Sequence, residues 1–124
     1  MALILLGEDD SDIRELVTYK LEHVGHTVVA VDNGAAVLVA ARQARPDLVI
    51  LDVMMPEMSG FEVCRALRGD PATAAVPVIM LTARAQEHDV ETGFEVGAHD
   101  YMTKPFSVRE LASRVTATLN RAAA

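Results

Sequence analysis

The stretch that decides the fold is Asp47-Leu-Val-Ile-Leu-Asp52, which runs directly into Val53-Met-Met-Pro-Glu-Met-Ser-Gly60. Four consecutive aliphatic residues between two acids predict a short strand, over residues 48–51, that is buried on both faces. The proline and glycine that follow predict a loop. Asp52 is therefore expected at the carboxyl end of a buried strand, where a rigid scaffold displays its carboxylate.

Three other candidate strands also end in residues that carry chemistry. The strand 2–6 is followed by Glu8 and Asp9, the strand 76–81 by Thr82, and the strand 100–103 by Lys104. The carboxyl ends of parallel strands meet at one edge of a sheet, and ligands bind there where the strand order reverses. These acids, the hydroxyl and the amine are therefore expected to form one site.

Along the whole chain, apolar runs alternate with helical patterns, which is typical of α/β proteins with a parallel sheet. Strands are predicted over residues 2–6, 27–31, 48–51, 78–81 and 101–103. Helices are predicted over residues 11–24, from 33 or 34 to just before Pro46, over 59–67, over 86–96, and from 107 onward. Right-handed crossovers between these units give an open, doubly wound sheet of five parallel strands with helices on both faces.

Two local patterns make these predictions more specific. The buried stripe of the first helix is expected to consist of its spaced aliphatic residues, Ile13, Leu16, Val17, Leu21 and Val24. Ser59-Gly-Phe-Glu62 and Ser107-Val-Arg-Glu110 both read as capping boxes at helix starts.

Composition restricts the class of protein. The 124 residues suit one domain, and we expect a single domain over 1–124. No apolar run approaches the ~20 residues of a membrane span, no basic leader precedes the first strand, and one cysteine, Cys64, excludes an internal disulfide. A cytoplasmic protein is expected. The net charge of -7 argues against direct binding of nucleic acid or anionic membranes and favours a cation or a basic protein partner.

The expected cluster of acids has a specific chemistry. Three carboxylates in one cleft repel each other unless a cation intervenes. Their ordinary partner is a hard divalent ion, Mg²⁺ or Mn²⁺, which takes oxygen ligands. The two positive charges of such an ion, together with that of Lys104, would balance the three negative charges of Glu8, Asp9 and Asp52. A metal and a lysine beside an exposed carboxylate are what phosphoryl transfer to that carboxylate requires.

Four motifs at strand ends resemble the receiver domain of two-component response regulators. They are Gly7-Glu-Asp-Asp10, Leu51-Asp-Val-Met-Met-Pro56, Leu81-Thr-Ala-Arg84 and Tyr101-Met-Thr-Lys-Pro-Phe106. The resemblance covers essentially the whole chain and is strongest to receivers of winged-helix transcriptional regulators. It implies a flavodoxin-like strand order, 2-1-3-4-5, and a signalling switch rather than an enzyme. A sensor histidine kinase or a phosphotransfer protein would supply the phosphoryl group, and a downstream protein or output domain would respond.

The resemblance also implies a role for each matching residue. Asp52 would be the phosphoacceptor, Asp9 a direct metal ligand, and Glu8 a ligand that acts through water. Met54 would give its backbone carbonyl to the metal. Thr82 and Lys104 would bind the phosphoryl group, and Tyr101 would turn inward when Thr82 moves. Slow self-dephosphorylation is expected because Met54 cannot orient water. The peptide Lys104-Pro105 is expected to be cis, and Gly7, where a larger apolar residue is usual, is expected to loosen the turn that carries the acids.

The output face implied by the resemblance comprises the fourth helix, fifth strand and fifth helix. Asp100 and Arg114 resemble one ion pair that crosses a dimer interface in such regulators, and Glu110 resembles half of another. Val90 stands where the basic partner of Glu110 is expected, and Glu91 where an apolar residue is usual. We therefore expect a monomer when the chain is unphosphorylated and at most a weak dimer when it is activated.

Three alternatives share this topology. A flavin-binding module would need a Ser/Thr/Gly-rich phosphate loop after the first strand, where this chain has acids that repel phosphate. An aspartate-dependent phosphatase would place its nucleophile after the first strand and add a cap domain. A receiver-like domain that is never phosphorylated would lack Asp52, Lys104 or the acid pair.

Overall fold

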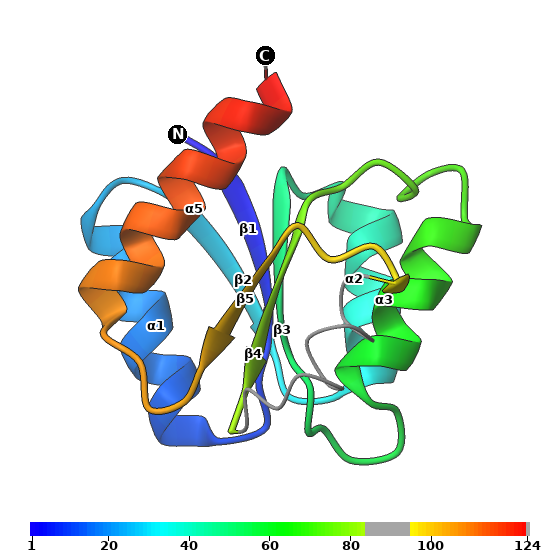
Figure 1. Cartoon of the computed structure of the whole chain (residues 1–124), viewed down its shortest axis with the longest axis horizontal. Helices are drawn as coiled ribbons and strands as arrows, with labels where there is room; N and C mark the ends of the chain where they lie inside the picture. The colour runs from blue at the N-terminus through cyan, green and yellow to red at the C-terminus, as the bar shows by residue number, and fades with distance from the viewer. Residues whose placement is uncertain (84–94, 124) are drawn as a thin grey trace.

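The computed structural model describes residues 1–83 and 95–123 and contains one sheet of five parallel strands (Figure 1). The strands are β1 Leu3–Gly7, β2 Thr27–Val31, β3 Leu48–Asp52, β4 Val78–Thr82 and β5 Asp100–Thr103. Their order in the sheet is β2-β1-β3-β4-β5. The predicted doubly wound sheet and its strand order are confirmed, and each predicted strand agrees with the observed one to within one residue at each end.

Helices cover both faces of the sheet. The helices are α1 Ser11–His23, α2 Gly34–Ala44, α3 Gly60–Gly69 and α5 Val108–Ala123. In Figure 1, α1 and α5 lie on one side of the sheet, and α2 and α3 lie on the other. The helix predicted over residues 86–96 lies, except for its last two residues, outside the described part of the chain.

The two sides of the sheet bury two separate aliphatic clusters. Leu5, Val49 and Met80 contribute to the cluster under α2 and α3, whereas their neighbours Ile4 and Ile79 contribute to the cluster under α1 and α5. Alternate residues of a strand point to opposite faces, so consecutive aliphatic residues fill both layers. Every residue of β3 and β4 is buried, as the uninterrupted apolar runs predict.

Polar side chains fix the helix starts. Asp10 caps α1 and Asn33 caps α2, and Ser59 forms the predicted capping box with Glu62. Of the second predicted capping box, the structure shows the bond in which Ser107 Oγ accepts from the Glu110 backbone N–H at 3.3 Å. The Glu110 carboxylate pairs with Arg114.

The buried stripe of α1 is narrower than predicted. Val17 and Leu21 are buried, but Leu16 is 54% exposed and Val24 is 47% exposed. Leu16 precedes Val17 by one position, which turns its side chain about 100° around the helix axis. Val24 follows the last helical residue as the C-cap. The prediction for these two residues was therefore wrong.

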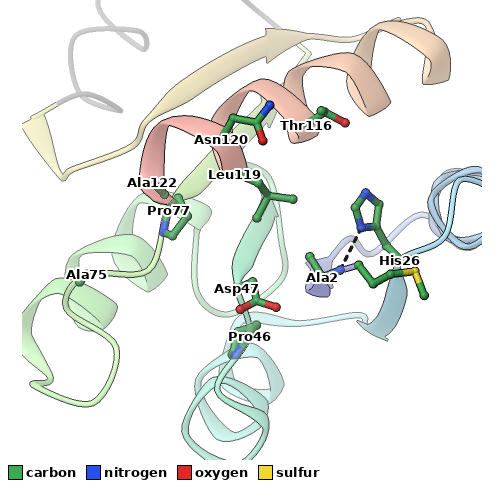
Figure 2. Close-up of a pocket in the computed structure, with 11 residues that line it drawn as sticks. Ala2, His26, Pro46, Asp47, Ala75, Pro77, Thr116, Leu119, Asn120 and Ala122 are labelled. Carbon is green, nitrogen blue, oxygen red and sulfur yellow. Dashed lines mark hydrogen bonds between the residues drawn. The ribbon is translucent and has the colours of Figure 1, made fainter. Parts of the chain in front are cut away.

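The amino ends of the strands surround a pocket of about 680 Å³ (Figure 2). His26 Nδ1 accepts from the Ala2 backbone N–H at 3.3 Å, and Asp47 Oδ2 accepts from the Leu3 N–H at 2.8 Å. These polar groups are thus used in fastening the start of β1, at the end of the sheet remote from Asp52. Within the described residues, no helix is long and apolar enough to cross a bilayer.

Candidate functional site

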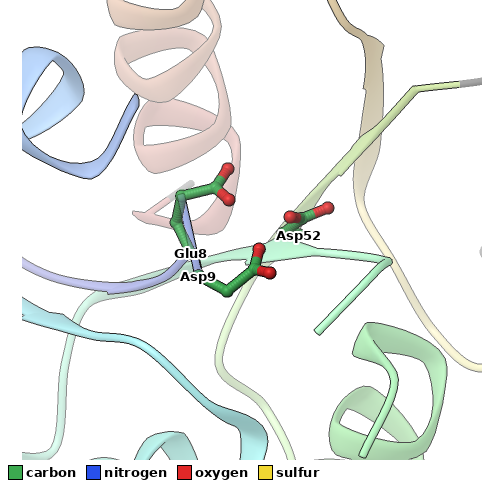
Figure 3. A group of neighbouring side chains, drawn as sticks. All are labelled: Glu8, Asp9 and Asp52. Carbon is green, nitrogen blue, oxygen red and sulfur yellow. The ribbon is translucent and has the colours of Figure 1, made fainter. Parts of the chain in front are cut away.

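The carboxyl ends of β1 and β3 bring three acids together. Gly7 pairs with Leu51 in the sheet, so Glu8 and Asp9, which follow β1, lie beside Asp52, which ends β3. One carboxylate oxygen from each acid lies within 4.8 Å of the others. Figure 3 shows Asp9 and Asp52 turned toward one another, with Glu8 beside them. The predicted convergence of these acids is present in the structure.

Lys104 closes the site from the end of β5. Its Nζ lies 2.8 Å from Glu8 Oε1 and 3.0 Å from Asp52 Oδ2. Its backbone N–H donates to the carbonyl of Thr82, which anchors the residue to the end of β4. The Lys104-Pro105 peptide is cis, as predicted. The amine thus bridges a carboxylate from each of two neighbouring strands.

Thr82 and Met54 lie beside Asp52, and Tyr101 lies two strands away on β5. Thr82 ends β4 next to Asp52 and is 3% exposed. The Met54 backbone N–H donates to Asp52 Oδ1 at 3.1 Å, while its side chain is 70% exposed. Tyr101 is partly buried and packs against the cluster under α2 and α3. All three occupy the expected positions, and the roles assigned to them stay predictions.

The loop after Asp52 is fixed by backbone contacts. The Gly60 N–H donates to the carbonyl of Val53 at 2.9 Å, which folds the start of α3 back onto the end of β3. A Cβ atom on Gly60 would lie 2.5 Å from the Asp52 carbonyl oxygen. Only a residue without a side chain fits this close approach. Gly60 therefore sets where the backbone of Asp52 lies.

Burial and mutual repulsion perturb the ionisation of the site. Burial, and then the neighbouring Asp52 carboxyl, raises the pKa of Glu8 to about 7, against the opposing effect of Lys104. Burial alone would lower the pKa of Lys104, but its contacts with Glu8 and Asp52 raise it above its ordinary value. The lysine thus stays charged, whereas Glu8 takes up a proton near neutral pH when no other cation is present.

Replacing Glu8 with glutamine is expected to stabilise the metal-free chain at pH 8. Because the pKa of Glu8 is raised on folding, its contribution to stability is present at low pH and is lost as the pH rises through 7. The expected gain in unfolding free energy at pH 8 is about 1–3 kcal/mol, and it should shrink toward pH 5. Urea unfolding with a chelator present, at both pH values, measures it.

Glu22→Gln is the matched control, because Glu22 is exposed on α1. This variant should show no comparable gain. A Glu8→Gln chain that is less stable than the parent at pH 8 would contradict the account of the buried carboxyl.

The donor set fits a hard divalent cation. Carboxylate oxygens are the ligands that Mg²⁺ prefers, and the three acids offer oxygens close enough to share one ion. The Glu8 carboxylate is 0% exposed. It shares the positive charge of Lys104 with the carboxylate of Asp52. A second positive charge would relieve the repulsion that raises the pKa of Glu8. The cluster could therefore bind a metal.

Three of the residues predicted to lie at a dimer interface, Asp100, Glu110 and Arg114, form ion pairs with one another. Arg114 contacts Asp100 at 2.9 Å and Glu110 at 3.1 Å within the same molecule. Val90 and Glu91 lie outside the described residues. The three charges predicted to cross an interface are therefore satisfied inside one chain.

Two residues of the site were not predicted from the sequence. Arg14 Nη1 donates to the Glu8 carbonyl at 2.9 Å and lies 3.4 Å from the Asp9 carbonyl oxygen. Gly60 lies against the backbone of Asp52. The signal for Arg14 was its position four residues after Asp10, and that for Gly60 was the capping serine directly before it.

Comparisons with known proteins agree with this geometry. The family model of the response regulator receiver domain matches residues 4–116. The chain is 46% identical to the DNA-binding dual master transcriptional regulator RpaA of Synechocystis, over 98% of this chain and 50% of that protein. It is 45% identical to the DNA-binding response regulator MtrA of Mycobacterium tuberculosis, over 95% and 50% respectively.

Among solved structures, the receiver domain of the sensor histidine kinase PA1611 from Pseudomonas aeruginosa superimposes with a TM-score of 0.88 at 29% identity. The match covers 96% of this chain and 98% of that one, and that structure has a magnesium ion coordinated in its active site cleft. The chain spans about half the length of the curated relatives it matches. By sequence and by fold, it belongs to the family of two-component response regulator receiver domains.

Proposed function

We propose that this chain is a phosphoacceptor switch in which Asp52 takes a phosphoryl group from a phosphohistidine. The donor would be a sensor histidine kinase or a phosphotransfer protein. The observation that carries this proposal is the Asp52 carboxylate, held at a strand end between Lys104 and two further acids. The match to the receiver family and the likeness to a receiver with bound magnesium support it.

In the proposed reaction, an Asp52 carboxylate oxygen attacks phosphorus. The bond between phosphorus and the donor imidazole nitrogen breaks, its electron pair returns to the ring, and an acyl phosphate forms on Asp52. Lys104, which pairs with Asp52 Oδ2 beforehand, would hold a phosphoryl oxygen afterwards. Thr82, next to Asp52 at the end of β4, would donate its hydroxyl to another.

Glu8, Asp9, Asp52 and the Met54 backbone carbonyl would hold Mg²⁺ or Mn²⁺. When bound, the ion supplies positive charge that offsets the charge on the transferring phosphoryl oxygens. The residues of the chain orient the phosphoryl group, and the Met54 N–H that donates to Asp52 Oδ1 fixes the direction of the carboxylate. Beyond its own phosphorylation and slow self-dephosphorylation, the domain catalyses nothing in this scheme.

The output would be a change at the surface around β5 and α5. Tyr101, which already packs inward against the cluster under α2 and α3, would be held in this position as Thr82 moves toward the phosphoryl group. We further propose that residues 1–124 act as one receiver domain that controls a downstream protein or an output domain. The net charge of -7 argues that this domain does not bind nucleic acid directly.

Incubation with acetyl phosphate tests the proposal. Intact-mass measurement should find one added phosphoryl group when Mg²⁺ is present and none when a chelator replaces it. The adduct should be removed by hydroxylamine, as expected of an acyl phosphate. A chain that gains no mass under any of these conditions would refute the proposed function.

Replacing Met54 with asparagine is expected to shorten the life of the phosphorylated state about tenfold, because one hydrogen bond that aligns water contributes about 1 kcal/mol or slightly more. The acyl phosphate is lost when water attacks in line. Met54 lies two residues after Asp52, exposed at the rim, and its thioether shields phosphorus without orienting water. The decay of the phosphoryl adduct, followed by mass, measures the change.

Met54→Leu is the control that keeps the shield and should decay as slowly as the parent. If Met54→Asn lost its label no faster than Met54→Leu, the role given to this side chain would be wrong.

The unphosphorylated chain is expected to be a monomer, and the activated chain at most a weak dimer. A dimer through the β5 and α5 face would have to exchange the contacts that Arg114 makes with Asp100 and Glu110 in one chain. Exposed ion pairs contribute only about 0.2–1 kcal/mol each, so the exchange gains little. Sedimentation velocity with and without beryllium fluoride, a phosphoryl mimic, measures the mass of the particle.

Asp52→Asn, which removes the proposed ligand of the mimic, serves as the control and should sediment alike in both conditions. A tight dimer formed by the activated parent on this face would contradict the expectation.

A further inference from the structure

Arg14 contacts the acidic turn from behind. Its guanidinium Nη1 donates to the Glu8 carbonyl at 2.9 Å and lies 3.4 Å from the Asp9 carbonyl oxygen. The side chain is half-buried, and its backbone N–H donates to the carbonyl of Asp10 at 2.9 Å. The bond to Asp10 is the ordinary backbone bond of the first helical turn, so the guanidinium itself contacts the carbonyls of two consecutive acids. The carboxylates of Glu8 and Asp9 are left to face Asp52 (Figure 3).

These carbonyls determine where the acid side chains point. Fixing a carbonyl fixes the backbone dihedral angles on either side of it, and hence the direction of the adjoining Cα–Cβ bonds. Glu8 has further anchors, since its N–H donates to Val31 and its Oε2 accepts from the Asp10 N–H. Asp9 is exposed, and its carbonyl contact with Arg14 ties it to α1. The orientation of Asp9 thus depends more on Arg14 than that of Glu8 does.

We propose that Arg14 is a positioning residue for the divalent cation at Glu8, Asp9 and Asp52. It holds the turn so that the acids present their oxygens together, although its own charge repels the cation. The inference rests on the proposed function, because it assumes that these acids bind Mg²⁺. In this proposal Arg14 acts through the backbone of the turn and contacts neither the ion nor the phosphoryl group.

Two physical effects of Arg14 have opposite signs, which makes the inference testable. A purely electrostatic role predicts that removing the positive charge tightens Mg²⁺ binding, because the attraction from the acids is then less opposed. A positioning role predicts weaker binding, since partners that orient metal ligands typically account for about 10–100-fold in affinity. The sign of the change in Kd therefore distinguishes the two.

The experiment compares Mg²⁺ binding by the parent, Arg14→Ala, Arg14→Lys and Arg65→Ala. Arg65 is exposed on α3, so its replacement changes the net charge equally and leaves the turn untouched. Isothermal titration calorimetry at fixed ionic strength, well below the unfolding temperature, gives the Kd of the folded chain, which global destabilisation alone does not change. Arg14→Ala should bind about tenfold more weakly, Arg14→Lys should recover part of the loss, and Arg65→Ala should match the parent.

Amide NMR spectra of the metal-free chains provide a second measurement. Arg14→Lys keeps the charge and most of the packing, so it remains informative even if Arg14→Ala fails to fold. The amide chemical shifts of Arg14→Lys should differ from those of the parent at Glu8, Asp9 and Asp10, and those of β3 should be unchanged. An unchanged or tighter Kd in Arg14→Ala, or a weaker Kd in Arg65→Ala of the same size, would overturn the positioning role. Failure of the parent itself to bind Mg²⁺ would instead overturn the proposed function, and the inference with it.

Discussion

Replacing Gly60 with alanine is expected to destabilise the chain by about 2–3 kcal/mol and to slow phosphorylation, because the new methyl group would overlap backbone rather than a movable side chain. Its Cβ would lie 2.5 Å from the Asp52 carbonyl oxygen and 3.0 Å from the Val53 Cα. Relief requires α3 to move away from the end of β3. That movement breaks the Gly60 to Val53 hydrogen bond and shifts the backbone that carries Asp52.

Gly69→Ala is the matched control at the other end of α3. A Cβ there would meet nothing within 4 Å, and alanine is the better helix former, so this variant should be as stable as the parent or slightly more stable. Urea unfolding and the initial rate of phosphorylation by acetyl phosphate should both separate the two variants. If Gly60→Ala proved as stable and as reactive as Gly69→Ala, Gly60 would not position Asp52.

The strands of the fold could be predicted because their sequence signal is local. Consecutive aliphatic residues in the third and fourth strands reflect burial on both faces, and the structure buries every residue of β3 and β4. The helix start at Ser59 could be predicted because a capping box lies within four residues. The strand order could be predicted by the family resemblance, since the apolar runs alone do not say which strands are neighbours.

Gly7 has packing neighbours that the sequence alone does not reveal. The missing side chain was expected to loosen the acidic turn, but a Cβ on Gly7 would lie 2.6 Å from Val37 Cγ2, with Leu51 and Met55 close behind. The space is filled by side chains from α2, β3 and the following loop, and Gly7 itself is buried. The space that a side chain would occupy is therefore filled, a packing between distant segments that has no local signature. The expected loosening of the turn stays a prediction.

The candidate site divides in the same way. Glu8, Asp9, Asp52 and Lys104 could be predicted, because a charged residue at the end of an apolar strand stands out in the sequence. Their contacts, such as the 2.8 Å pairing of Lys104 with Glu8, required the structure. Arg14 and Gly60 were missed because both contact backbone atoms, and their positions after Asp10 and Ser59 do not by themselves predict such contacts.

Replacing Asp52 with asparagine is expected to abolish phosphorylation. An amide is neutral, and its oxygen is a far weaker nucleophile than a carboxylate, so no acyl phosphate can form at this position. Asp52 is 3% exposed, within reach of Lys104 and the acid pair, and the other acids lack its combination of a Lys104 contact and a place at the end of a central strand. Glu8 also contacts Lys104, but its carboxylate is fully buried and already accepts from the Asp10 backbone N–H.

The most direct test is the intact mass of three chains after incubation with acetyl phosphate and Mg²⁺: the parent, Asp52→Asn, and Asp32→Asn as a control. Asp32 is exposed just after β2 and has no part in the proposed site. The account predicts one added phosphoryl group on the parent and on Asp32→Asn, and none on Asp52→Asn. A phosphoryl adduct that survives undiminished in Asp52→Asn would contradict it.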